Sequence, residues 1–293
     1  MGTGRSVLVL GNNGMLGHAV ESILRSFKDI DVITSSKLGK NSSYKFNVLT
    51  DNIEELIDLI APDYVINCIG IIKPRIIAGV SGSIREAIHI NSVFPHNLFR
   101  ATDGKNIKII QIATDCVFSG LHGDYKEEAL HDAHDVYGKT KSLGEVESEN
   151  FLNLRVSIIG PENGRATSLL EWFLNQEKGA QLQGYSNHFW NGIGTYQFAK
   201  IALGIIREEQ FVEGNFHLLP ADKVSKFELL SIFREVYNRG DINISETVPE
   251  VVIDRTLSTL SPEKNQLFWG LANYSKVPTI REIVDEIKIL SEA

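Results

Sequence analysis

The sequence predicts a doubly wound α/β fold, in which helices cover both faces of a mostly parallel sheet. Short apolar runs alternate with longer amphipathic stretches over the first 160 residues. The runs VLVL, YVIN and IKIIQIA are continuously apolar, as strands buried on both faces are. The first run leads directly into GNNGMLG at 11–17, a glycine-rich strand-to-helix turn. Together these observations predict a sheet of the Rossmann type.

The expected elements follow the chain in order. Strands are predicted at the apolar runs, at 6–10, 31–34, 64–68, 108–113 and 153–158. Amphipathic periodicity predicts helices at 16–26, 51–60, 83–100, 137–148, 168–178, 196–208, 226–239 and 279–291. Capping-box spacing supports three helix starts, through the pairs Asp51 and Glu54, Ser225 and Glu228, and Thr279 and Glu282.

The alternation of predicted strands and helices ends near residue 160, and mostly helical segments follow. This change divides the chain into two lobes. Residues 1–165 are predicted to form the Rossmann-type domain, and residues 166–293 a smaller, mostly helical lobe that binds substrate. Some segments of the second part are expected to return to the sheet. No internal repeat is apparent.

Composition excludes several classes of partner. The chain has 293 residues, 29 basic and 37 acidic side chains, and a net charge of −8. This charge argues against nucleic acid or an anionic membrane as partner. The two cysteines cannot form a disulfide framework, and no apolar run reaches the roughly 18 residues of a membrane span. We therefore expect a cytoplasmic protein.

The glycine-rich turn predicts a dinucleotide site. Gly11 permits a sharp turn, Gly14 allows close approach of a pyrophosphate, and Gly17 allows helix and strand to pack. Free N–H groups of the following helical turn would point at the pyrophosphate. The remaining turn residues expected to contact the cofactor are Asn13, Met15 and Leu16. The alternative is a tight βα turn without a ligand.

The end of the second strand bears on the choice of cofactor. An acidic residue there typically holds the ribose hydroxyls of NAD, but this chain has Ser35, Ser36 and Lys37. Hydroxyls and a lysine suit the 2′-phosphate of NADP, so we expect NADP(H) to be favoured over NAD(H). The alternative is that Lys37 is a solvated loop charge.

A second motif predicts carbonyl chemistry. Tyr137 and Lys141 are four residues apart, so on a helix they share a face. The Lys141 charge is expected to lower the pKa of Tyr137, which would then give a proton to a carbonyl oxygen as hydride arrives. Thr114 directly follows the predicted strand 108–113, and its hydroxyl is expected to bind the same oxygen. The alternative is an exposed helix face.

The motifs GNNGMLG, NCIG at 67–70, ATDCVFSG and YGKTK, in this order, resemble an extended short-chain dehydrogenase/reductase. The most similar subgroup is the dTDP-4-dehydrorhamnose reductase-like (RmlD-like) proteins, which bind sugar nucleotides. The resemblance implies a catalytic triad of Thr114, Tyr137 and Lys141, with Lys141 also on the nicotinamide ribose. It implies that Cys68, Ile69 and Gly70 form a loop that lines the cofactor. It also implies that the substrate pocket contains Asp115, Cys116, Val117, Trp190 and Asn191.

The chain departs from the subgroup at Cys116, where a tyrosine is usual. In the related GDP-fucose synthases, a cysteine at the equivalent place is an epimerisation base, and Cys116 is either such an acid/base or a pocket-lining thiol. Trp190 either stacks on the nucleotide or sugar, or fixes the second lobe. Arg155 faces either a diphosphate or an acidic partner. His131 and His134 have a spacing compatible with a metal, but we expect none.

The resemblance implies an enzyme that uses NADPH to reduce a nucleotide-linked 4-keto-6-deoxysugar for surface-polysaccharide synthesis. The first alternative is a bifunctional epimerase/reductase with Cys116 as base. The second is a non-catalytic, NADP-binding regulatory subunit, as in the methionine adenosyltransferase β-subunit relatives. The resemblance also implies a homodimer.

Overall fold

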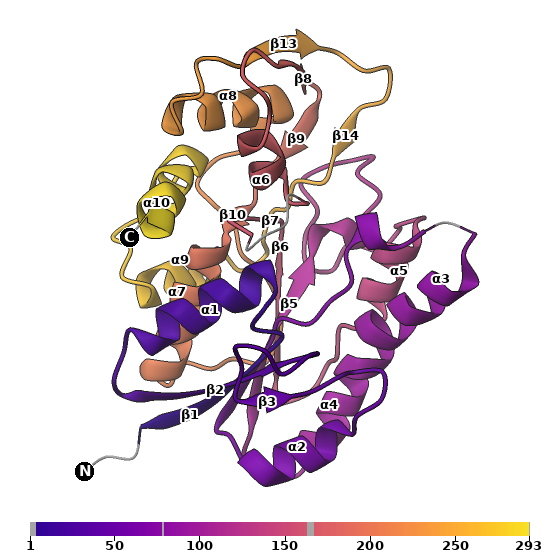
Figure 1. Cartoon of the computed structure of the whole chain (residues 1–293), viewed down its shortest axis with the longest axis vertical. Helices are drawn as coiled ribbons and strands as arrows, with labels where there is room; N and C mark the ends of the chain where they lie inside the picture. Colours follow the sequence, from indigo (N-terminus) through magenta and orange to yellow (C-terminus); the bar gives the residue numbers. More distant parts are fainter. Residues whose placement is uncertain (1–3, 78, 163–166, 293) are drawn as a thin grey trace.

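The computed structural model describes residues 4–77, 79–162 and 167–292, and its centre is a seven-stranded parallel sheet (Figure 1). The strand order is β11-β6-β5-β4-β1-β2-β3. The strands are β1 (Arg5–Leu10), β2 (Ile30–Ser36), β3 (Tyr44–Lys45), β4 (Tyr64–Asn67), β5 (Lys108–Thr114), β6 (Phe151–Val156) and β11 (Gly214–His217). The predicted doubly wound α/β fold is therefore confirmed.

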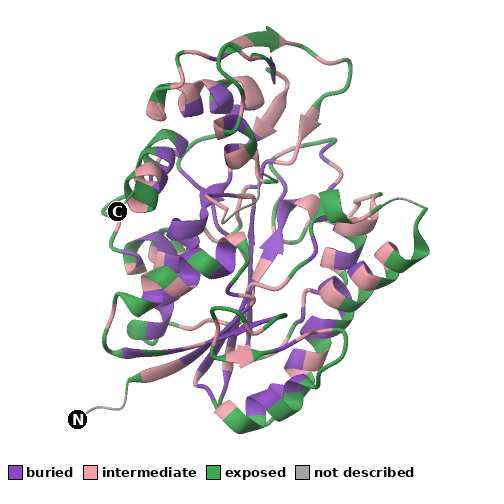
Figure 2. Ribbon diagram, in the orientation of Figure 1, coloured by how far each residue is buried: buried purple, intermediate pink, exposed green. Residues whose placement is uncertain are grey.

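The apolar run of β1 fills two cores at once. Val7 and Val9 belong to one buried cluster, whereas Leu8 and Leu10 belong to a second one, because successive strand residues point to opposite faces. All four side chains are fully buried. Figure 2 shows the sheet as a buried layer with exposed residues on the outer helix surfaces.

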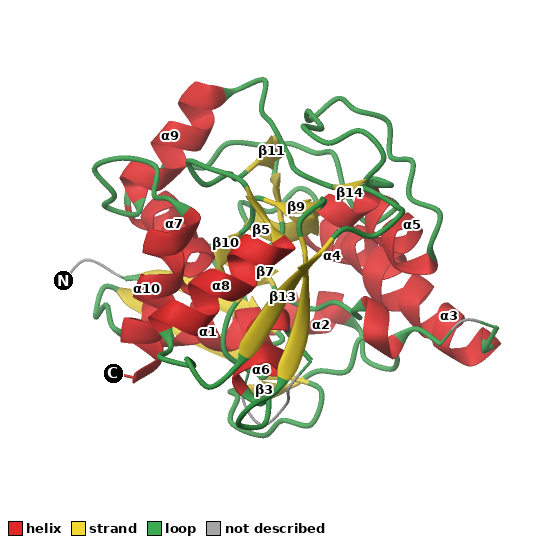
Figure 3. Ribbon diagram, turned by 90° about the horizontal axis from the view of Figure 1, so that it is seen from above, coloured by secondary structure: helices red, strands yellow, loops and turns green. Residues whose placement is uncertain are grey.

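Helices cover both faces of this sheet (Figure 3). On one side are α1 (Met15–Arg25), α7 (Thr195–Arg207) and α9 (Pro262–Leu271). On the other are α2 (Ile53–Ile60), α3 (Ser81–Ile88), α4 (Phe94–Thr102) and α5 (Val136–Ser142). A π-helical turn, His89–Val93, joins α3 to α4, so the predicted helix at 83–100 is continuous but locally widened.

The second lobe lies at the top of Figure 1. Its helices are α6 (Leu169–Leu174), α8 (Lys226–Val236) and α10 (Ile280–Glu292). Small sheets pair β7 (Ile158–Ile159) with β10 (Ile193–Gly194), β8 (Gln181–Tyr185) with β13 (Asn243–Thr247), and β9 (His188–Trp190) with β12 (Val224–Ser225) and β14 (Ile253–Asp254). The expected division at residue 165 lies outside the described residues.

The structure corrects two predicted helix ends and adds one helix that was not predicted. Asn52, not Asp51, caps α2, because its side chain accepts the Glu54 N–H while Asp51 accepts the N–H of Asn47. The helix predicted at 137–148 ends at Ser142. Helix α9 was not predicted, although Ser-Pro-Glu at 261–263 is a helix-start signal.

The other two capping predictions are confirmed. Ser225 and Glu228 form a reciprocal capping box at α8. Thr279 and Glu282 also exchange hydrogen bonds at the start of α10. Over the part of the chain that the structure describes, no helix is long and apolar enough to cross a membrane.

Candidate active site

The glycine turn between β1 and α1 has the geometry of a phosphate-binding loop. Gly11 has φ +83°, and its N–H donates to the Ser35 carbonyl oxygen over 2.9 Å. A Cβ on Gly17 would lie 2.2 Å from the Gly11 carbonyl oxygen, so no side chain fits there. No side chain caps α1 at Gly14, which leaves first-turn N–H groups available to an anion.

Ser35, Ser36 and Lys37, which are predicted to determine the preference for NADP(H) over NAD(H), lie beside this turn in different environments. Ser35 is fully buried and its hydroxyl has no hydrogen-bond partner among the described residues. Ser36 is buried, and its hydroxyl lies 2.9 Å from the Ser42 hydroxyl. Lys37 is exposed, with its ammonium 4.0 Å from the Glu86 carboxylate.

Other predicted turn residues hold the turn itself. The Asn13 amide donates to the Lys40 carbonyl oxygen over 2.9 Å, so this side chain fixes the loop after β2. Asn12, overlooked in the sequence analysis, donates to Glu21 and to the Asn41 carbonyl oxygen. Leu16 is buried in the core, and the Met15 side chain is only partly covered.

The loop after β4 packs against the glycine turn. Cys68 donates its N–H to the Leu10 carbonyl oxygen over 3.1 Å, and the Ile69 side chain lies directly against Gly11. Gly70, which follows, is exposed. The predicted cofactor loop therefore borders the turn, and burial raises the pKa of the Cys68 thiol above its usual range.

Asn91, also overlooked, joins this loop to α5. Its side chain accepts the N–H of Ile71 and donates to the Ile71 carbonyl oxygen and the Thr140 hydroxyl. Asn91 lies in the π-helical turn and is 2% exposed. A buried asparagine at a widened helical turn is the available sequence-level signal.

The Thr114, Tyr137 and Lys141 side chains converge at the carboxyl end of β5. Gly138 permits this convergence, because a Cβ there would lie 2.2 Å from the Cys116 carbonyl oxygen. The Lys141 ammonium donates to the Ile112 carbonyl oxygen over 3.0 Å. A side-chain hydrogen bond with Thr114 acts to lower the pKa of Tyr137. Asp135 caps α5 by accepting the Gly138 N–H.

Burial dominates the protonation of these groups. It raises the pKa of Tyr137 above its usual range, although the hydrogen bond from Thr114 opposes the rise. The expected influence of Lys141 on the pKa of Tyr137 is not among the main causes of this shift, which are burial and the groups Cys116, Thr114, Asp115 and Asp135. Burial also lowers the pKa of Lys141 to about 8, and Glu145 opposes that change.

Two cations from the second lobe reach the segment after Thr114. Asp115 is buried and accepts the Thr114 hydroxyl over 3.1 Å. Burial raises the pKa of Asp115, while the Thr114 hydrogen bond and the charges of Arg255 and Lys226 oppose the rise. Burial, reinforced by the Asp115 charge, raises the pKa of Cys116 to about 12. Neither Arg255 nor Lys226 was predicted to lie here, because both come from segments distant in the sequence.

Three residues predicted to bind substrate instead pack in the core or form hydrogen bonds within the protein. Val117 is fully buried among Phe118 and its neighbours. Trp190 is 5% exposed and its indole N–H donates to the Ser157 hydroxyl over 2.8 Å. Both polar atoms of the Asn191 amide bind the Leu257 backbone. This favours the interpretation of Trp190 as a packing residue.

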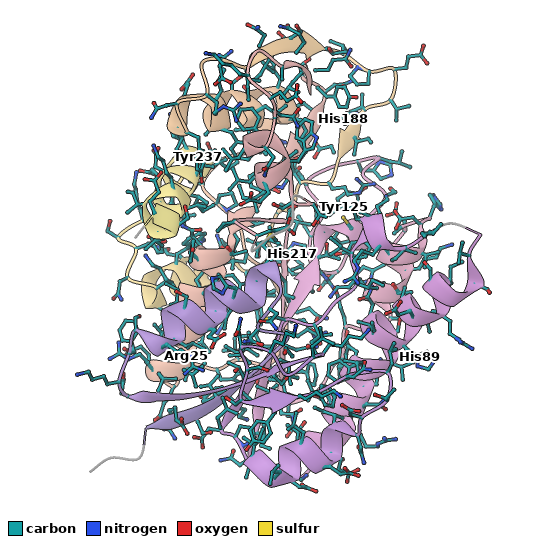
Figure 4. All side chains as sticks on the ribbon, viewed as in Figure 1. Arg25, His89, Tyr125, His188, His217 and Tyr237 are labelled. Carbon is teal, nitrogen blue, oxygen red and sulfur yellow. The ribbon has the colours of Figure 1, made fainter. Side chains whose placement is uncertain are left out.

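Arg155 is paired with an acidic side chain. Its guanidinium makes three contacts of 2.6–3.0 Å with the Glu145 carboxylate, and both side chains are at most 5% exposed. His217, labelled in Figure 4 with Tyr125 near the junction of the lobes, lies 3.2 Å from Arg155. Burial lowers the pKa of His217 to about 4, so it is neutral at pH 7 beside this arginine.

The His131 and His134 pair does not form a metal cluster with neighbouring side chains. His131 Nδ1 lies 2.7 Å from the Ser142 hydroxyl, and His134 is exposed. Within the described ranges, no group of three or more His, Cys, Asp or Glu side chains is arranged to hold a metal ion.

Comparisons with known proteins agree with this geometry. The model of the family described as "RmlD substrate binding domain" matches residues 5–251. Methionine adenosyltransferase 2 subunit beta of Xenopus tropicalis is 23% identical over 263 residues, covering 85% of this chain and 77% of that protein.

Two solved structures share the fold. A dTDP-4-dehydrorhamnose reductase from Clostridium acetobutylicum has a TM-score of 0.76 at 20% identity, covering 99% of this chain and 100% of that one. The Bacillus anthracis reductase in complex with NADP has a TM-score of 0.76 at 17% identity, covering 98% and 99%. Since the family model spans most of the sequence, the chain belongs to the RmlD-like family of extended short-chain dehydrogenase/reductases.

Proposed function

We propose that the protein uses NADPH to reduce the keto group of a nucleotide-linked 4-keto-6-deoxysugar, in cytoplasmic synthesis of surface-polysaccharide sugars. The observation that carries this proposal is the convergence of Thr114, Tyr137 and Lys141 at the end of β5. This end of a parallel strand is where α/β folds place their ligands. The glycine turn lies at the same edge of the sheet.

The turn fits a dinucleotide. The uncapped start of α1 offers backbone N–H groups to a pyrophosphate, and Gly14 leaves room for its approach. The Ser35 carbonyl oxygen accepts the Gly11 N–H, and the buried Ser35 hydroxyl has no hydrogen-bond partner among the described residues. Lys37 and Ser36 support NADPH over NADH, because a 2′-phosphate there would meet a cation and a hydroxyl. The ratio of kcat/KM for the two cofactors tests this preference.

The catalytic roles follow from the protonation states. Bound NADPH would supply hydride to the carbonyl carbon. Tyr137, which its raised pKa keeps protonated, gives its proton to the carbonyl oxygen, and Thr114 holds that oxygen in place. The ammonium form of Lys141 then stabilises the tyrosinate that remains.

The test is loss of NADPH absorbance with a panel of nucleotide 4-keto-sugars. We expect Tyr137→Phe to lower kcat by about 10²–10⁴-fold with NADPH affinity unchanged. Tyr185→Phe is the matched control, since Tyr185 is exposed on β8, and it should retain full activity. Equal activity of Tyr137→Phe and wild type would refute the assignment.

A regulatory role is the second candidate function. The observation that favours it is the similarity to methionine adenosyltransferase 2 subunit beta, whose name describes a subunit. Binding of NADPH and of a methionine adenosyltransferase catalytic subunit, without reduction of any ketosugar, would establish this role instead. We also propose a homodimer, to be measured by light scattering.

The bifunctional epimerase/reductase is less well supported. An epimerisation base must be deprotonated, but burial raises the pKa of the Cys116 thiol to about 12. Loss of solvent-hydrogen exchange into the sugar in Cys116→Ser would nevertheless establish that activity. Without such exchange in the wild type, Cys116 is a thiol that lines the pocket.

A further inference from the structure

Two neighbouring lysines of the second lobe differ in their partners. The Lys223 ammonium lies 6.0 Å from the Phe189 ring centroid and 3.3 Å from the Asp124 carboxylate. The Lys226 ammonium lies 5.4 Å from the Trp190 ring centroid. Among the described residues, however, Lys226 has no hydrogen-bond acceptor and no carboxylate within 4.0 Å. Lys223 is therefore paired, whereas Lys226 is a cation without a bonded anion.

The groups facing Lys226 leave an excess of positive charge. Asp115, Cys116 and Arg255 are the groups that act on it electrostatically. Only Asp115 is a carboxylate, and its nearest bonded partner is the Thr114 hydroxyl. Arg255 donates through Nε to the Phe118 carbonyl oxygen, so it also stays in this region. Asp115 is thus the one carboxylate among the groups that act on Lys226, whereas Arg255 also acts on the Asp135 carboxylate.

This arrangement is unfavourable without a further anion. A partly buried ammonium that lacks a bonded acceptor loses hydration without compensation. Burial accordingly lowers the pKa of Lys226 to about 8, with Asp115 and Cys116 opposing the change. The position is also close to the proposed chemistry, because Cys116 acts on Lys226 and packs against the helix of Tyr137, where a Cβ on Gly138 would lie 2.2 Å from the Cys116 carbonyl oxygen.

We propose that Lys226 is a substrate-recognition residue whose ammonium binds an anionic oxygen of the nucleotide-linked substrate beside Cys116. This inference rests on the proposed function for the class of substrate. An ammonium is a compact charge with three donors, and it suits a diphosphate oxygen or a sugar carboxylate. The Trp190 ring shields one side of the ammonium from water and strengthens the interaction.

The experiment measures calorimetric binding of UDP, dTDP, UDP-glucose and UDP-glucuronate to the full chain at pH 7.5. The variants are Lys226→Met, Lys226→Arg and the matched control Lys223→Met. We expect Lys226→Met to weaken binding about tenfold or more, and Lys226→Arg to recover part of it. Lys223→Met should stay within about twofold of wild type.

The probes separate the two sources of the anion. A loss of affinity for all four probes identifies a diphosphate contact, and a loss for UDP-glucuronate alone identifies a sugar carboxylate. Wild-type affinity should also decline above about pH 8 as Lys226 deprotonates, and Lys226→Met should lack this decline. Thermal unfolding of each variant confirms that it folds.

Three results would overturn the inference: unchanged affinities in Lys226→Met, equal losses in Lys226→Met and Lys223→Met, or no binding of any probe by wild type. Failure of the proposed function gives a different result. In that case the protein binds these nucleotides through Lys226, yet oxidises no NADPH with any ketosugar.

Discussion

Replacing Lys141 with methionine should make the protein more stable at pH 7 while abolishing reduction. Lys141 is largely buried, and burial lowers its pKa from 10.5 to about 8. Below pH 8 the ammonium is charged in both the folded and the unfolded chain, so the folded state carries the full cost of burying the charge. Methionine has a similar length and no charge, so this cost disappears.

The magnitude follows from the same pKa values. A change from 10.5 to about 8, at about 1.36 kcal/mol per pH unit, corresponds to roughly 3 kcal/mol. The lost hydrogen bond to the Ile112 carbonyl oxygen offsets about 1 kcal/mol of this gain. We therefore expect a net stabilisation of about 2 kcal/mol, or a rise in Tm of about 4 °C for a chain of this size.

The pH dependence gives the sharper assay. The unfolded chain binds more protons at Lys141 between about pH 8 and 10.5, so wild type gains stability relative to Lys141→Met as the pH rises through this window. Urea unfolding at pH 7, 8, 9 and 10 measures the difference. Lys139→Met is the control, because Lys139 is exposed on the same helix and should change stability by less than about 0.5 kcal/mol. The reasoning is refuted if Lys141→Met is less stable at pH 7, or if the difference does not shrink with pH.

Three other predictions follow. Gly17→Ala should abolish NADPH binding measured by fluorescence, since its Cβ would lie 2.2 Å from a carbonyl oxygen; Gly82→Ala, with open space around it, should bind normally. Glu145→Gln should cost about 3–5 kcal/mol in urea unfolding, because it leaves a buried guanidinium without its counter-charge. Glu147→Gln is the exposed control, and equal effects of the two would contradict the interpretation. Cys116 should react with a thiol reagent at pH 8 about 10³-fold more slowly in the folded than in the unfolded protein, because burial raises its pKa to about 12; similar rates would disprove this protonation state.

The sequence predicted best what depends on neighbouring residues. The run VLVL predicted a strand buried on both faces, and Val7 and Leu8 do enter different cores. Ser225 and Glu228 lie three residues apart, so their capping box was visible before folding. The close approach of Gly17 to the Gly11 carbonyl oxygen was predictable for the same reason, since both residues belong to one glycine-rich turn.

The features that sequence analysis overlooked depend on contacts between distant segments. The helix containing Lys141 ends early, and a Cβ on Gly144 would lie 1.8 Å from the Asn91 carbonyl oxygen, a contact that spans more than fifty residues. The strands β9, β12 and β14 are two or three residues long, too short for any periodic pattern. Arg255 and Lys226 reach Asp115 only because these strands bring their segments together.

Asn91 has a consequence for how this active site can change during evolution. Its amide holds the backbone at Ile71 and the hydroxyl of Thr140 at the same time. We therefore expect that residues can be inserted or deleted in exposed turns outside this contact, such as 103–106, without displacing the cofactor loop from the helix of Tyr137. Substitution of Asn91 or Thr140, in contrast, removes a side chain that makes one of these hydrogen bonds, whereas Ile71 takes part only through its backbone. The cofactor loop and the helix of Tyr137 are thus expected to keep their relative positions, while residues on the surrounding surface can change and alter substrate specificity.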